Sequence, residues 1–123
     1  MVKSFYHIEV VNQDTDERLF SAYRHDLKVA REVAKKIREK LEKDGMKYFC
    51  HDSHTYLVEW SEYWLYEKDC ECIEVSVRLD DCAMQDRDGK VIYFSDCETK
   101  TFEDESEAIC WMYEEEEKSQ IQI

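Results

Sequence analysis

The feature that most constrains this chain of 123 residues is a period-two pattern from Thr55 to Leu79. Every second residue from position 56 to 66 is aromatic or β-branched except Glu62, in the order Tyr56, Val58, Trp60, Glu62, Trp64, Tyr66. After a break at Lys68-Asp69, alternation resumes with Ile73, Val75, Val77 and Leu79. Successive side chains of a strand point to opposite faces of the sheet. The pattern therefore predicts two long adjacent strands at the centre of a sheet, with the aromatic row in its core.

The residues before this hairpin predict two further strands and a helix. Alternation predicts strands over 4–11 and 18–23, joined by the polar turn 12–17. Asp26 is the expected N-cap of the helix and Gly45 its left-handed C-cap. Between them one apolar stripe recurs at spacings of three and four, formed by Leu27, Ala30, Val33, Ala34, Ile37 and Leu41. Residues 46–50 predict a short strand, which His51-Asp52-Ser53-His54 is expected to end.

The residues after Leu79 predict a weaker strand, a hairpin and a last helix. Asp80-Asp81 precedes a strand around 82–85, and Asp88-Gly89 is a strong turn signal before a strand over 90–95. A helix is expected from Phe102 or Glu105 to about Lys118, with fraying over about 115–123 because Glu114 to Glu117 repel one another. The order predicts one α+β domain over 1–123, a mostly antiparallel sheet of about five to seven strands packed against one long helix in the N-terminal half and a C-terminal helix.

The net charge of −13 is concentrated in the second part of the chain. Residues 1–45 carry a net charge of +1, and residues 46–123 a net charge of −14. Such a surface is repelled by nucleic-acid phosphates and by anionic membranes, so we expect no direct binding to either. The oligomeric state is left open.

The chain contains six cysteines, whose oxidation state depends on the cellular compartment. No signal peptide and no apolar run long enough to span a bilayer is visible, so we expect a cytoplasmic protein with reduced thiols. The even cysteine count leaves a disulfide-bonded alternative open. Acids flank three of the thiols and raise the pKa expected for them, which is unfavourable for a nucleophile: Cys70, Cys82 and Cys97.

Zinc binding is the one cofactor alternative that the spacing permits. Cys50, His51, His54, Cys70 and Cys72 are possible ligands from two neighbouring segments. Their spacing differs from that of common structural zinc sites, and we expect neither a cofactor nor catalysis. The loop from Asp86 to Gly89 is not a calcium loop, because Met84 and Ser95 occupy two ligand positions.

Acidic side chains on the sheet are the favoured binding feature. Same-face residues of a strand lie about 6.6 Å apart, so rows of carboxylates can imitate a phosphate backbone and dock on a basic channel. The expected partner is the basic surface of a nucleic-acid-binding protein. The candidate partner-binding residues are Glu62, Glu74, Asp80, Asp81, Asp86, Asp88, Asp96 and Glu98.

In size, acidity and element order the chain resembles small phage-encoded inhibitors, notably anti-CRISPR and anti-restriction proteins. Three acid-rich stretches carry the resemblance, 69–74, 80–88 and 103–117. It implies a non-enzymatic protein that inhibits its target by occupying a nucleic-acid groove. The alternative is a protein–protein adaptor or small regulator that uses the aromatic strand or a dimer interface.

Overall fold

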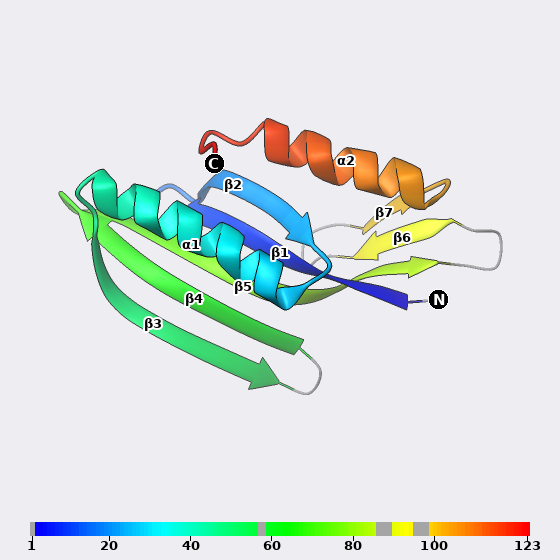
Figure 1. Cartoon of the computed structure of the whole chain (residues 1–123), viewed down its shortest axis with the longest axis horizontal. Coiled ribbons are helices and arrows are strands. Elements are labelled where there is room, and N and C mark those ends of the chain that lie inside the picture. The colour runs from blue at the N-terminus through cyan, green and yellow to red at the C-terminus, as the bar shows by residue number, and fades with distance from the viewer. Residues whose placement is uncertain (1, 57–58, 86–89, 95–98) are drawn as a thin grey trace.

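The computed structural model describes residues 2–56, 59–85, 90–94 and 99–123, and has an α+β fold (Figure 1). Five strands form the main antiparallel sheet in the order β2-β1-β5-β4-β3. Their bounds are β1 Val2–Asn12, β2 Glu17–Arg24, β3 Lys47–Tyr56, β4 Glu59–Lys68 and β5 Glu71–Gln85. Two short strands extend from the far end of β5, where β6 (Val91–Phe94) pairs with β5 and β7 (Thr99–Phe102) pairs with β6. The helices are α1 (Leu27–Lys43) and α2 (Glu105–Glu117).

The predicted central hairpin is confirmed as β4 and β5. Trp64 pairs with Val75 and Tyr66 with Ile73 in the antiparallel register. These side chains therefore share the face of the sheet that α1 covers. Trp64 and Tyr66 are 6% and 1% exposed, which confirms core packing for these two rings.

Helix α1 closes the main core. Asp26 caps it by accepting hydrogen bonds from the backbone N–H groups of Lys28 and Val29, as expected from its position. Gly45 ends it with a φ of +88°, a left-handed conformation that glycine adopts without strain. The apolar stripe of α1 packs on Ile8, Val10, Phe20 and the central strands, so the helix is held by burial along its whole length.

Helix α2 lies along the outer edge of β2 (Figure 1). A second cluster joins it to the sheet, formed by Tyr23, Val91, Phe102, Ala108 and Met112. The fraying expected over about 115–123 stays a prediction, and the structure gives the contacts of this segment. The helix continues to Glu117, and beyond it Ile121 N–H donates to Leu19 O at 3.1 Å while the Ile121 side chain packs on the main core. The tail thus covers backbone groups of an edge strand.

Three expected element boundaries differ from the structure. Strand β3 runs through 51–54, because its backbone pairs with β4 although its side chains are polar. Strand β5 runs through Asp80-Asp81, which pairs with β1 at Phe5. Strand β7 occupies 99–102, where the sequence pattern predicted the approach to the last helix. Hydrogen bonds between the backbones of paired strands determine all three boundaries. Such bonds produce no alternation of apolar and polar residues in the sequence.

Candidate functional site

The predicted row of sheet acids does not include Glu62. This residue is 6% exposed and faces α1, where its carboxylate accepts from Arg31 Nε at 3.0 Å and from His51 Nε2 at 2.8 Å. A carboxylate with both oxygens occupied inside the protein is not available to a partner. Its prediction as a partner-binding residue is therefore corrected, because a cation from the first helix neutralises it.

Glu74 lies on the opposite face of the sheet. It pairs with Leu65 in the register, and Gln13 Nε2 donates to its carboxylate. Burial raises the pKa of Glu74 above its ordinary value, while Arg78 nearby lowers it and Glu9 raises it. Glu62 and Glu74 thus do not share one row. Asp80 and Asp81 belong to β5 but their side chains are not described, and Asp86, Asp88, Asp96 and Glu98 lie outside the described residues.

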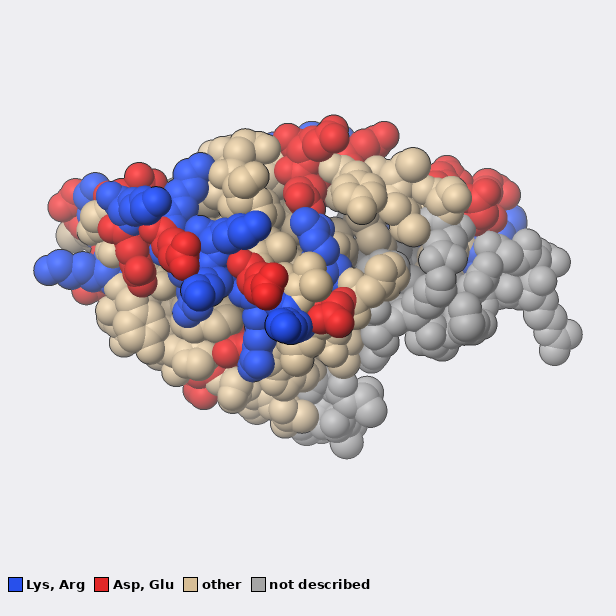
Figure 2. Space-filling view, viewed as in Figure 1, with Lys and Arg blue, Asp and Glu red and all other residues tan. Residues whose placement is uncertain are grey.

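The acidic surface that the structure does describe lies on α2 and its N-terminal approach (Figure 2). Residues 103–117 contain eight carboxylates and no lysine or arginine. Spacings of seven and three place Glu107, Glu114 and Glu117 on one face of α2, and Glu103 lies just before the N-cap Asp104; all four are exposed. The acid-rich stretch was visible in the sequence, but only the packing of Met112 and Ala108 shows which face points outward.

The N-terminus of α2 uses part of this charge locally. Asp104 Oδ1 accepts from the Glu107 N–H at 2.9 Å, and Glu107 Oε2 accepts from the Glu103 N–H at 2.7 Å. This reciprocal arrangement is similar to a capping box. In a standard box the second hydrogen bond comes from the backbone N–H of the N-cap residue, and here it comes from Glu103, one residue earlier. At the other end, Arg24 holds Glu116 through two N–H···O contacts at 2.7 and 3.2 Å. Helix α2 is therefore a fixed support for the outward carboxylates.

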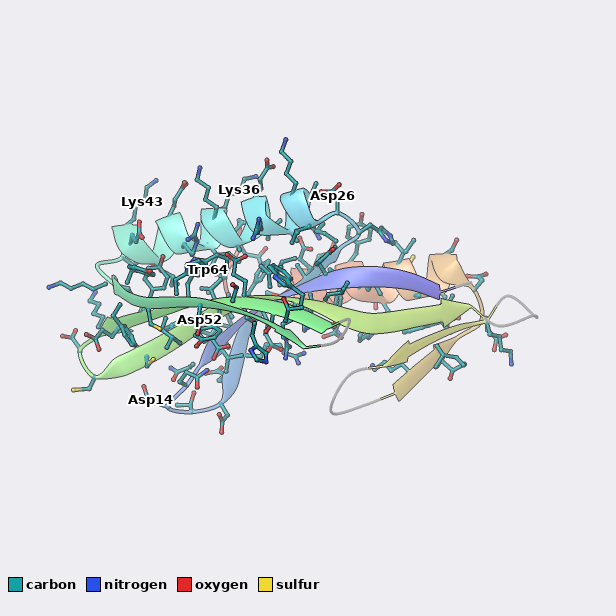
Figure 3. All side chains as sticks on the ribbon, turned by 90° about the horizontal axis from the view of Figure 1, so that it is seen from below. Asp14, Asp26, Lys36, Lys43, Asp52 and Trp64 are labelled. Atoms are coloured by element: carbon teal, nitrogen blue, oxygen red, sulfur yellow. The ribbon has the colours of Figure 1, made fainter. Side chains whose placement is uncertain are left out.

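A second surface, the α1 groove, opens between α1 and strands β3 and β4. Its volume is about 830 Å³. Lys28, Arg31, Lys35 and Arg38 line it from the helix, and Tyr48, His51, Trp64 and Tyr66 from the sheet. Figure 3 shows Trp64 between α1 and the sheet, with Lys36 and Lys43 on the outer side of the helix. The sequence did not predict the groove, because nothing in it shows that α1 lies mainly over β1, β2 and β5 and leaves a groove along β3 and β4.

Aromatic and cationic groups are stacked inside the α1 groove. His51 stacks on Trp64 with ring centroids 5.1 Å apart, and the Arg38 guanidinium lies 4.3 Å from the Trp64 ring centroid. Tyr66 donates to Glu42 Oε1 at 3.2 Å. Burial, and next the Glu42 carboxylate, raise the pKa of Tyr66 to about 12. These contacts hold the floor of the groove in one arrangement.

A polar cluster lies on the other face of the sheet. His7 and Ser21 are 2% and 3% exposed, with His7 Nε2 2.8 Å from Ser21 Oγ. Arg78 Nη2 lies 3.4 Å from His7 Nδ1, so three polar side chains of three strands meet in this cluster.

The cysteines do not gather into a metal site in the part of the chain that the structure describes. There, no three side chains among His, Cys, Asp and Glu are placed to hold a metal ion. Four thiols are free, those of Cys50, Cys70, Cys72 and Cys110. Burial raises the pKa of the Cys72 thiol, and the carboxylates of Asp14, Glu67 and Glu74 add to the effect.

No known protein family, curated protein or solved structure matches the chain. Neither helix of the described residues combines the length and apolar character that crossing a bilayer requires.

Proposed function

We propose that this protein is a non-enzymatic acidic binding protein that inhibits a nucleic-acid-binding protein by occupying its basic groove. The observation that carries the proposal is the acidic face of α2, formed by Glu107, Glu114 and Glu117 and extended by Glu103 just before the helix. These carboxylates point outward from a helix that is anchored by its cap and by Arg24. A rigid anionic row needs no ordering when it docks, which favours binding.

The dimensions of the acidic face suit a phosphate-binding channel. Glu117 follows Glu107 by ten residues, which corresponds to about 15 Å along the helix, and Glu103 extends the row beyond the N-cap. Lysines and arginines that grip nucleic acid are spaced to meet phosphates along a comparable length. The net charge of −13 would also steer the protein toward a basic partner and keep nucleic acid itself away.

The proposed partners are intracellular, as is the protein. Reduced thiols are the ordinary state in the cytoplasm.

Affinity capture with matched variants tests the proposal. The immobilised protein is incubated with a cell lysate at low salt, and bound proteins are eluted with about 0.5 M salt. At that concentration screening reduces the range of charge attraction to a few ångströms. The eluted proteins are identified by mass spectrometry. The test variant is Glu114→Gln/Glu117→Gln, because both side chains are exposed and neither is bonded to a described residue. We expect it to bind the captured protein about three to ten times more weakly.

The matched control is Glu39→Gln/Glu67→Gln, which removes the same charge from exposed positions on α1 and β4. It should bind within about twofold of the wild type, because a distant surface charge contributes little at physiological salt. Equal weakening in both variants would mean that net charge, rather than α2, governs binding. Salt-resistant capture would contradict the electrostatic proposal as a whole.

The edge of β3 favours a second candidate, an adaptor that binds a protein partner. This strand ends the main sheet, and in the described chain only β4 pairs with it. Tyr48 and Phe49 on it are 52% and 50% exposed. An edge strand with exposed aromatics can receive another strand. In the same capture experiment Phe49→Lys would then abolish binding, while the α2 variant would not.

A further inference from the structure

The α1 groove has the size and lining of a small-molecule site. Its volume of about 830 Å³ falls within the range of ligand pockets, about 300 to 1,000 Å³. It lies on the opposite side of α1 from Lys36 and Lys43, which Figure 3 shows pointing away from the sheet. The acidic face of α2 has no residue among those that line it. The proposed inhibition through α2 therefore does not account for the groove.

Cations along one side of α1 make the groove locally positive. Lys28, Arg31, Lys35 and Arg38 follow one another at spacings of three, four and three, a stripe about 15 Å long. Lys28 and Lys35 form no ion pair with any residue that the structure describes. Three acids also line the groove. Glu62 is paired with Arg31, Glu42 accepts a hydrogen bond from Tyr66, and Glu32 is exposed, so the lining has four cations against three carboxylates.

Arg38 points most directly to a missing acceptor. Its Nε atom is buried, and no atom of the described residues accepts a hydrogen bond from it. The guanidinium is held over the Trp64 ring, and its N–H groups lie in the plane of the group. Stacking therefore fixes the orientation of the Nε–H donor without satisfying it. A buried donor without a partner is costly, and an anionic oxygen would remove that cost.

The sheet side of the groove offers a surface for an aromatic ring. Tyr48 is 52% exposed and meets Tyr66 edge-on, with centroids 5.9 Å apart. Arg38, Tyr48 and Glu42 all lie close enough to Tyr66 to affect its ionisation. An exposed ring and a guanidinium with an unsatisfied Nε atom thus both lie near one buried tyrosine. A ligand that combines a planar ring with an anionic group can contact both.

We propose that the α1 groove binds a small aromatic organic anion. Lys35 and Arg38 hold the anionic group, and Tyr48 packs against the ring of the ligand. Arg31 and His51 have a supporting role, since both donate to Glu62 and remain fixed by it. The charge of the groove gives the ligand a positive site on a protein whose total charge would otherwise repel it.

A fluorescent aromatic sulfonate, 8-anilinonaphthalene-1-sulfonate, is the probe for this proposal. Its emission increases when it leaves water, so a titration of the full chain measures its dissociation constant. We expect saturable binding to the wild type and binding weaker by about tenfold or more in Lys35→Gln/Arg38→Gln. The matched control is Lys36→Gln/Lys43→Gln, which removes the same charge from the outer side of α1 and should bind within about twofold of the wild type.

Two further measurements keep the result interpretable. Thermal unfolding followed by circular dichroism excludes probe binding to a loosened fold, and Lys35→Gln alone, at an exposed position, provides a variant that leaves Arg38 over Trp64 in place. The neutral analogue N-phenyl-1-naphthylamine tests the charge of the ligand. Equal binding of the two probes, equal effects of both double variants, or the absence of saturable binding would overturn the proposal.

Discussion

At the scale of single residues, Glu62 links helix α1 to the edge strand β3. It is 6% exposed and joins Arg31 of α1 to His51 of β3. In Glu62→Gln the amide nitrogen would face one of these donors, so one hydrogen bond is lost and the charge is gone. We expect the free energy of unfolding to fall by about 1 to 2 kcal/mol, a modest value because half of the Arg31 side chain lies in water.

Urea unfolding at neutral pH measures this loss. Glu67→Gln serves as the control, since it removes an exposed carboxylate from the same strand. The two variants should differ clearly, and an equal effect would show that the contacts of Glu62 add nothing to stability.

Tyr66 makes the stability of the fold sensitive to alkaline pH. Its pKa is raised to about 12 by burial and by Glu42, whereas an unfolded tyrosine has a pKa of about 10. Between these values the folded protein holds the proton more tightly than the unfolded chain. The stabilisation is therefore complete below about pH 10 and is lost as the pH rises through about 12.

Tyr66→Phe removes this ionisation while keeping the ring. We expect the wild type to lose more unfolding free energy than the variant between about pH 9 and about pH 11, because the other tyrosines are common to both. Urea titrations at the two pH values give the difference. Parallel losses would contradict the assignment to Tyr66.

At the scale of elements, α1 depends on its N-cap as well as on burial. Asp26 Oδ1 accepts from Lys28 N at 2.8 Å and from Val29 N at 3.2 Å. Asp26→Ala should lower the free energy of unfolding by about 1 kcal/mol, while Asp26→Ser, which can accept the same bonds, should stay within a few tenths. Chemical unfolding of both variants tests this, and an equal loss would mean that the cap bonds do not contribute.

The elements that could be predicted from sequence are those whose apolar side chains recur with the spacing of a helix or of a strand. In α1 the stripe from Ala30 to Leu41 is buried and bounded by caps, and in β4 and β5 the rows from Trp60 to Tyr66 and from Ile73 to Val77 meet the same core. Burial on one face produces the pattern in the sequence, so the pattern identifies both the element and its inner face.

The elements that could not be predicted are held by their backbones. Strand β3 pairs with β4 on one side only, and its 51–55 segment is exposed, so polar side chains are tolerated there. Part of the candidate site was predicted wrongly for a similar reason. Alternation placed Glu62 on a face correctly, but it could not show that α1 would bring Arg31 onto that face. The sequence did not predict the α1 groove for the same reason.

At the scale of the whole molecule, the charge is divided between the two helices (Figure 2). Residues 27–43 carry seven lysines and arginines and three acids, whereas residues 103–117 carry eight acids and no base. One helix therefore presents cations beside the α1 groove and the other an anionic row. The two proposed binding surfaces, for an organic anion and for a basic protein, thus lie at separate places on one small domain.

The anionic row of α2 is the basis of the proposed inhibition, and competition for the captured partner tests it most directly. A fluorescently labelled nucleic acid bound by that partner is titrated with this protein, and its fluorescence anisotropy is followed. We predict that the anisotropy falls to the value of the free nucleic acid, and that Glu114→Gln/Glu117→Gln requires about three to ten times more protein for the same fall. An anisotropy that stays constant or rises, as in a ternary complex, would contradict the account.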